Sequence, residues 1–155
     1  MNTELTIKKP DLLKPTLIFS AVGIFIPAFT AILLLGFQML LSSIGLECHN
    51  AWKVLWTITI LGGLTLPIFF YRHIKKLTEK KLENLKTRLS VFNLIEYTFI
   101  QASLALFFTS GQTLCYVSDG QNGLELVFTA WLALPILIVF SLLFEQRLKT
   151  AMKNE

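Results

Sequence analysis

Long stretches without charge alternate with short polar segments along this 155-residue chain. A helix crosses the roughly 30 Å hydrocarbon layer of a bilayer with about 20 predominantly apolar residues. Stretches of about that length or longer, free of Asp, Glu, Lys and Arg, cover residues 15–46, 54–71, 97–118 and 126–144. In lipid the backbone must satisfy its own hydrogen bonds, which favours helices over open strands. The pattern predicts four membrane-spanning helices, at about residues 16–43, 52–72, 89–116 and 123–145.

The composition agrees with this interpretation. The chain is 54% hydrophobic and only 15% charged, with thirteen phenylalanines. A soluble domain carries about 25% charged residues, so this chain is short of the charge that a water-facing surface needs. We therefore expect an all-α fold: a single integral-membrane domain over residues 1–155, built as a four-helix bundle.

The distribution of Lys and Arg predicts the orientation. Thirteen of the fourteen basic residues lie in the two tails or in the loop between the second and third uncharged stretches, and only Lys53 lies elsewhere. Cytoplasmic loops of membrane proteins carry an excess of Lys and Arg. We expect both termini and residues 72–89 to face the cytoplasm. The short length and the absence of a glycosylation sequon favour a multi-pass protein of a bacterial inner membrane.

The segment from residue 72 to 89 is the largest polar segment. Its apolar residues recur at near-helical spacing with lysines between them, which predicts a helical cytoplasmic hairpin that extends the second and third helices. Alternatively, the segment forms an amphipathic surface for anionic lipid or an acidic protein partner. It lacks the interleaved aromatic residues of a nucleic-acid platform, so we expect no nucleic-acid partner. The basic residues of this candidate surface are Arg72, Lys75, Lys76, Lys80, Lys81, Lys86 and Arg88.

The two cysteines, Cys48 and Cys115, both fall near the predicted outer surface. That compartment permits disulfides, so a bond between them is one prediction. Two free thiols are the alternative, because sequence does not show whether their Cα atoms lie within bonding distance. His49 and His73 lie on opposite sides of the membrane in this topology and cannot share a haem. Glu47 adjoins Cys48 and His49, but neighbouring side chains splay apart, so we expect neither a metal nor a cofactor.

The third predicted helix is the most polar of the four. Glu96 lies inside it, where a charged side chain at the bilayer centre costs about 2.5–3.5 kcal/mol and less at shallower depth, so we expect it to face protein or water. At 100° per residue the polar positions fall on two flanks about 140° apart, because seven-residue steps drift by only about 20°. One flank holds Asn93, Glu96, Ser103 and Ser110, and the other holds Gln101 and Gln112.

Polar flanks in lipid need neighbours. Either the third helix is central and bonds within its own bundle, or one flank meets another subunit of a homo-oligomer. The aromatic pair Trp52 and Trp56 lies where an aromatic belt would anchor the second helix. Prolines at 27, 67 and 135 predict kinks in the other helices, whose freed carbonyls need donors from elsewhere.

These features favour a non-enzymatic protein. The sequence contains no Ser-His-Asp set, no paired intramembrane carboxylates and no glycine loop that could cradle a phosphate. We expect a protein that acts through protein–protein interaction in the bacterial inner membrane. A membrane sensor, an immunity protein or a phage-defence subunit with a cytoplasmic effector partner would fit. The alternative is a small proton- or ion-coupled transporter or channel that uses Glu96.

Overall fold

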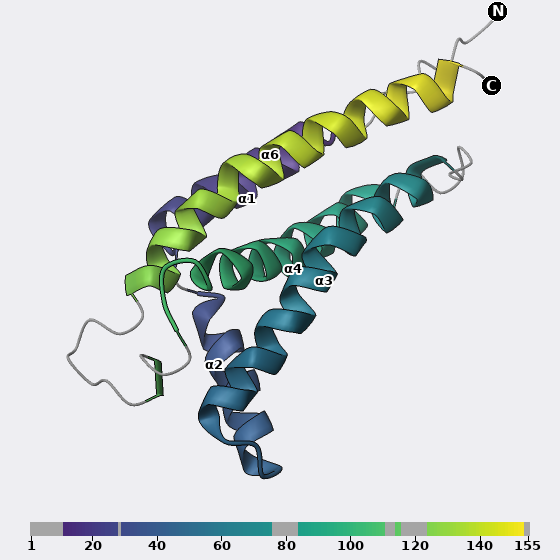
Figure 1. Cartoon of the computed structure of the whole chain (residues 1–155). Helices are drawn as coiled ribbons and strands as arrows, with labels where there is room; N and C mark the ends of the chain where they lie inside the picture. Colours follow the sequence, from purple (N-terminus) through teal and green to yellow (C-terminus); the bar gives the residue numbers. More distant parts are fainter. Residues whose placement is uncertain (1–10, 28, 76–83, 111–113, 116–123, 154–155) are drawn as a thin grey trace, which may run out of the picture.

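The computed structural model of the chain describes residues 11–27, 29–75, 84–110, 114–115 and 124–153 (Figure 1). In these ranges the fold is all-helical, as predicted, and contains no strand. The helices are α1 (Leu13–Phe25), α2 (Ala31–Ser43), α3 (Cys48–Lys75), α4 (Leu85–Ala105) and α6 (Leu124–Lys153).

Helices α3 and α6 are long and apolar enough to cross a membrane. The qualifying segments are Cys48–Ile74, with a mean hydropathy of 1.8, and Val127–Met152, with a mean hydropathy of 2.5. Large apolar side chains also cover much of the described surface: Phe25 is 86% exposed, Phe107 80% and Ile32 73%. Extended apolar surface of this kind marks contact with a membrane or with other proteins.

The segment expected to form one helix over residues 16–43 is two helices in the structure. α1 and α2 each contain 13 residues. Each is therefore about 20 Å long at 1.5 Å per residue, less than the thickness of the hydrocarbon layer. The break falls around Pro27, whose ring removes a backbone donor and clashes with the preceding turn.

The third predicted helix, 89–116, also differs from its expected bounds. α4 begins at Leu85 and ends at Ala105, so Ser110 lies beyond the helix rather than on its polar flank. Gln112 falls outside the described residues. α3 and α4 extend into the predicted hairpin from both sides, while residues 76–83 between them are not described.

The helices form two arms with α4 between them (Figure 1). α1 lies along α6, α2 lies along α3, and the two arms diverge with distance from one end of the molecule. One apolar cluster runs along α4 and α6, and at that end it joins the start of α1, the end of α3, the start of α4 and the C-terminal part of α6. The residues that mark this cluster at the four positions are Leu12, Ile74, Leu85 and Leu148. These four helix ends adjoin the two tails and the loop that the sequence predicts to be cytoplasmic. They meet at one end of the fold.

A second apolar cluster lies toward the other end. It contains Leu34 of α2, Trp52 and Trp56 of α3, and Ala102 and Ala105 of α4. The two tryptophans are only 1% and 5% exposed. They therefore pack in the core between helices, and the expectation of an aromatic belt at these positions is wrong.

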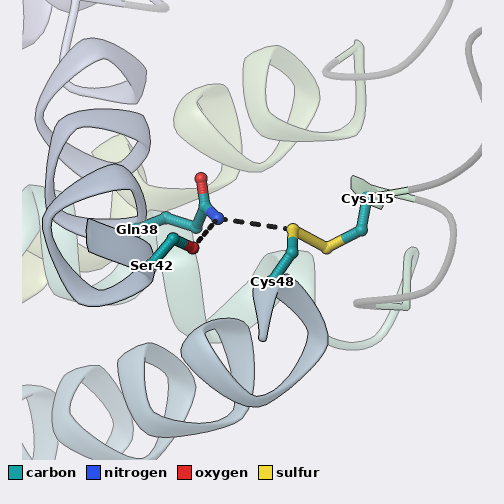
Figure 2. The surroundings of a disulfide bond; sticks show 4 residues. All are labelled: Gln38, Ser42, Cys48 and Cys115. Atoms are coloured by element: carbon teal, nitrogen blue, oxygen red, sulfur yellow. Dashed lines mark hydrogen bonds between the residues drawn. A yellow bond between two sulfur atoms is a disulfide. The ribbon is translucent and has the colours of Figure 1, made fainter. Parts of the chain in front are cut away.

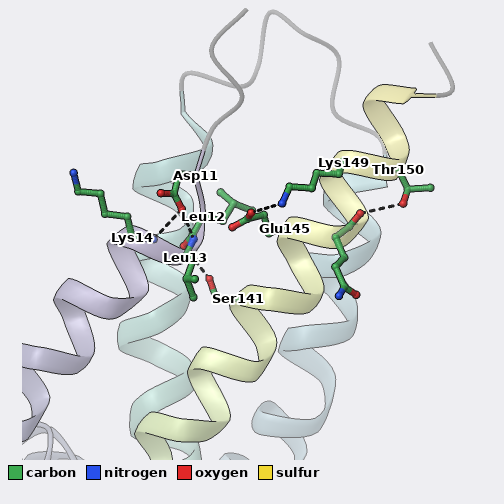
Figure 3. Close-up of polar contacts among 9 residues, drawn as sticks. Asp11, Leu12, Leu13, Lys14, Ser141, Glu145, Lys149 and Thr150 are labelled. Carbon is green, nitrogen blue, oxygen red and sulfur yellow. Dashed lines mark hydrogen bonds and ion pairs between the residues drawn. The ribbon is translucent and has the colours of Figure 1, made fainter.

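Polar contacts fix the start of α1 against α6 (Figure 3). Asp11 Oδ1 accepts hydrogen bonds from the backbone N–H groups of Leu13, at 3.0 Å, and Lys14, at 3.1 Å. The Ser141 hydroxyl of α6 donates to the Leu12 carbonyl at 2.8 Å. The two bonds to Asp11 satisfy N–H groups that a helix start leaves without partners, and the Ser141 bond links the start of α1 to α6.

Candidate functional site

The break between α1 and α2 is held by side chains from α4 and α6. Tyr97 Oη donates to the Pro27 carbonyl at 3.0 Å, and Trp131 Nε1 donates to the Ile24 carbonyl at 3.3 Å. The Thr30 hydroxyl donates to the amide oxygen of Gln101. Carbonyls freed by the broken helix are thus paired. The Gln101 side of α4 meets its partner within the chain.

Asn93 belongs to a second buried network. Its Nδ2 donates to Thr16 Oγ1 at 3.0 Å, and Thr16 Oγ1 lies 3.1 Å from Ser141 Oγ. All three side chains are buried, and they join α4, α1 and α6. Sequence reasoning missed Thr16 and Ser141. A single hydroxyl in an apolar helix can bond its own backbone, so its residue type does not reveal a long-range partner.

Glu96 lies on the same helix but has no such partner. Its side chain is 0% exposed, and neither carboxyl oxygen has a hydrogen-bond partner among the described residues. The hydroxyl of Ser103, two turns further along α4, also lacks a partner there. Two of the candidate residues on α4 thus keep hydrogen-bonding capacity that the described residues do not use.

Both residues line one pocket, which we call the Glu96 crevice. It has a volume of about 310 Å³ and lies where α3 and α6 pack around α4. Gly63 lies opposite the carboxyl, where a Cβ atom would be 3.8 Å from Glu96 Oε1. Because glycine has no Cβ atom, this space stays open. The remaining lining is apolar and consists of Ile60, Leu64, Ile100, Leu104, Phe107, Ile136 and Phe140.

In this crevice the Glu96 carboxyl is a hydrogen-bond acceptor that receives no hydrogen bond from the described residues. A buried polar group left without a hydrogen bond costs about 1–3 kcal/mol, and more if it is charged. Among the described residues no second titratable side chain lines the pocket, whereas acid–base and nucleophilic catalysis use several converging groups. The described residues also contain no group of three His, Cys, Asp or Glu side chains that could hold a metal ion.

Cys48 and Cys115 are joined by a disulfide in the structure (Figure 2). Their Cα atoms lie 5.9 Å apart, inside the usual range for such bonds. Gln38 Nε2 of α2 donates to Ser42 Oγ at 3.0 Å and to Cys48 Sγ at 3.3 Å. The start of α3 is thereby tied to α2 and to the segment that follows α4.

The candidate basic surface is described only in part. Arg72, Lys86 and Arg88 are exposed at the ends of α3 and α4, and the Arg88 guanidinium donates to the His73 ring. Lys75 is the last residue of α3, and Lys76, Lys80 and Lys81 lie outside the described residues. The structure thus places three of the seven side chains near the junction of α3 and α4.

Comparisons with known proteins yield no relative of this chain. No protein-family model, no curated protein and no solved structure matches it.

Proposed function

We propose that the protein is a non-enzymatic, multi-pass protein of a bacterial inner membrane that acts by binding another membrane protein at the Glu96 crevice. The observation that carries this proposal is the Glu96 carboxyl itself, which is buried and has no hydrogen-bond partner among the described residues. Buried polar groups in native proteins are nearly always paired, and an exception calls for a functional explanation.

The surroundings of the carboxyl support a partner from the membrane. Leu64 and Phe107 line the crevice and are 66% and 80% exposed, so its edge is apolar and accessible from outside the chain. Lipid tails carry no donor for Glu96 or Ser103. A neighbouring transmembrane helix with Lys, Arg, Asn, Gln or Ser supplies one when the apolar side chains that cover the carboxyl move aside, and polar side chains are a common link between helices in lipid.

The wider role follows from the two ends of the fold. The exposed cations Arg72, Lys86 and Arg88 lie at the end where we place the cytoplasm, and they suit an acidic effector. A membrane sensor, an immunity protein or a phage-defence subunit needs these two faces: one for a signal in the membrane and one for a cytoplasmic partner. The partner at the crevice is another protein or a second copy of this chain.

Co-purification tests the proposal. The full chain is extracted from its source membrane in mild detergent as wild type, Glu96→Met and Thr65→Val. Thr65 is an exposed residue of α3 that bonds only carbonyls of its own helix, so its variant is the control. We expect one membrane protein, or a second copy of the chain, to accompany wild type and Thr65→Val and to be lost from Glu96→Met. Equal recovery with all three proteins would contradict the proposal.

A transporter or channel is the second candidate, and the broken first segment favours it. Discontinuous helices at membrane depth recur at the substrate sites of transporters, and α4 connects the break at Tyr97 with Glu96, its neighbour in sequence. Proton or cation flux into liposomes with the purified protein, absent with Glu96→Gln, would establish this function in place of the first. We expect no flux from either protein.

A further inference from the structure

A second pocket lies between α3 and α4, at the end where the two helices join the undescribed loop. It has a volume of about 600 Å³, within the usual range of ligand sites. The walls further from that loop consist of apolar side chains, of which Phe69 and Val91 are 65% and 53% exposed. We call it the α3–α4 groove.

The rim of the groove is cationic. His73 and Arg88 line it one to two helical turns from Phe69 and Ile95, and the Arg88 guanidinium donates to the His73 ring. Arg88 is exposed and has further N–H groups available for an acceptor. Among the described residues no acidic side chain lines the groove, and the exposed cation Arg72 directly precedes His73 on α3.

The groove is complementary to both parts of an amphiphile, since its rim is cationic and its walls are apolar. Arg88 and Ile95 are seven residues apart on α4, so the apolar wall continues for about 10 Å below the rim. An acyl chain fits such a wall, and a phosphate matches the remaining N–H donors of Arg88. Basic pockets between membrane helices on the cytoplasmic side are suited to anionic headgroups. An acidic peptide would use the rim but leave the exposed apolar wall uncovered.

We infer that the α3–α4 groove binds one anionic glycerophospholipid, with its phosphate at Arg88 and an acyl chain along Phe69, Val91 and Ile95. This site is separate from the Glu96 crevice, with which it shares no lining residue. It therefore stands or falls independently of the proposed partner. Such a lipid would fix the junction of α3 and α4 relative to the membrane surface.

Native mass spectrometry of the detergent-purified full chain tests this inference. Phosphatidylglycerol and phosphatidylcholine with identical acyl chains are the probes. We expect wild type to retain phosphatidylglycerol at least about fivefold better than phosphatidylcholine, and Arg88→Gln to lose about fivefold of that retention, as expected for one Arg at an anionic headgroup. Lys14→Gln removes an exposed charge from α1 outside the groove and should leave retention unchanged.

A second variant separates the groove from general charge attraction. Val91→Trp fills the apolar wall and leaves every cation in place, so we expect it to reduce retention of phosphatidylglycerol as well. Circular dichroism checks that both variants keep the helical content of wild type. Equal retention of the two lipids, or unchanged retention in Arg88→Gln or Val91→Trp, would overturn the inference. Displacement of the lipid by an acidic peptide, but not by added neutral lipid, would overturn it in favour of a protein at the rim.

Discussion

At the scale of single residues, two neighbours on α4 have opposite environments. Tyr97 satisfies a carbonyl of the broken segment, whereas the carboxyl of Glu96 meets an apolar pocket and no donor among the described residues. An unpaired buried carboxyl is expected to destabilise the isolated chain, and under the proposed function it gains its hydrogen-bond donor in a complex. Functional sites often carry a stability cost of this sort.

Replacing Glu96 should therefore stabilise the protein when it is purified alone. Glu96→Met keeps most of the side-chain volume and removes two unpaired acceptors, for an expected gain of about 1–3 kcal/mol. Thermal unfolding in detergent, followed by circular dichroism, measures the change as a higher Tm. Glu47→Met is the control, since its carboxylate is exposed and surface substitutions usually change stability by no more than about 0.5 kcal/mol. A lower Tm for Glu96→Met would mean that the carboxyl holds the fold together.

Adjacent glycines of α3 give a second contrast between residues. A Cβ atom on Gly62 would lie 2.3 Å from Cε2 of the Phe99 ring, whereas one on Gly63 would have its nearest contact at 3.6 Å. Gly62→Ala must displace that ring, and overpacking of this kind costs about 1–3 kcal/mol. We expect a lower Tm for Gly62→Ala and an unchanged or higher Tm for Gly63→Ala. Equal effects of the two variants would show that α3 and α4 do not approach closely there.

At the scale of elements, the main difference from the sequence prediction lies in the first segment. Pro27 marks a kink in the sequence, but a proline does not determine whether a helix bends or ends. That outcome depends on whether donors reach the freed carbonyls. Here they come from Tyr97 and Trp131, each at least 70 residues away. Local pattern cannot predict contacts of this range, which is why one long helix was expected where two short ones form.

The two side chains that donate to carbonyls at the break between α1 and α2 should not contribute equally to the stability of the fold. Tyr97 is fully buried, so Tyr97→Phe leaves the Pro27 carbonyl without its partner and should cost about 1–3 kcal/mol of unfolding free energy. Trp131 is 48% exposed, and Trp131→Phe should have a smaller effect. Chemical denaturation in mixed micelles gives both values. A larger loss for Trp131→Phe would contradict this ranking.

At the scale of the whole molecule, the sequence predicted the helical class, and periodicity brought out the polar positions of α4. It did not predict which of those positions are paired. Gln101 and Glu96 are both polar and both buried, yet one meets Thr30 and the other meets an apolar crevice. The difference depends on how the α1–α6 arm and the α2–α3 arm are placed around α4, which is a property of the assembled fold. The four-span bundle and its orientation stay predictions.

The disulfide connects the start of α3 with the segment that follows α4. Cys48 and Cys115 are 67 residues apart, and a bond that closes a loop of this size contributes typically about 2–4 kcal/mol. We expect a reductant to lower the Tm of wild type but not that of the Cys48→Ser/Cys115→Ser double variant. A thiol reagent that cannot cross membranes should label both cysteines from outside the cell only after reduction. Full labelling without reductant would exclude the bond.

The central claim is that Glu96 awaits a donor from another protein in the membrane, and crosslinking within living cells tests it most directly. A photoreactive phenylalanine analogue replaces Leu64 at the edge of the crevice, which is 66% exposed, or, as the control, Ile32 of α2, which is 73% exposed. We expect a defined protein adduct from position 64 and none of that mass from position 32. The adduct should disappear when Glu96→Met is added. An adduct that persists in Glu96→Met, or the same products from both positions, would contradict the account.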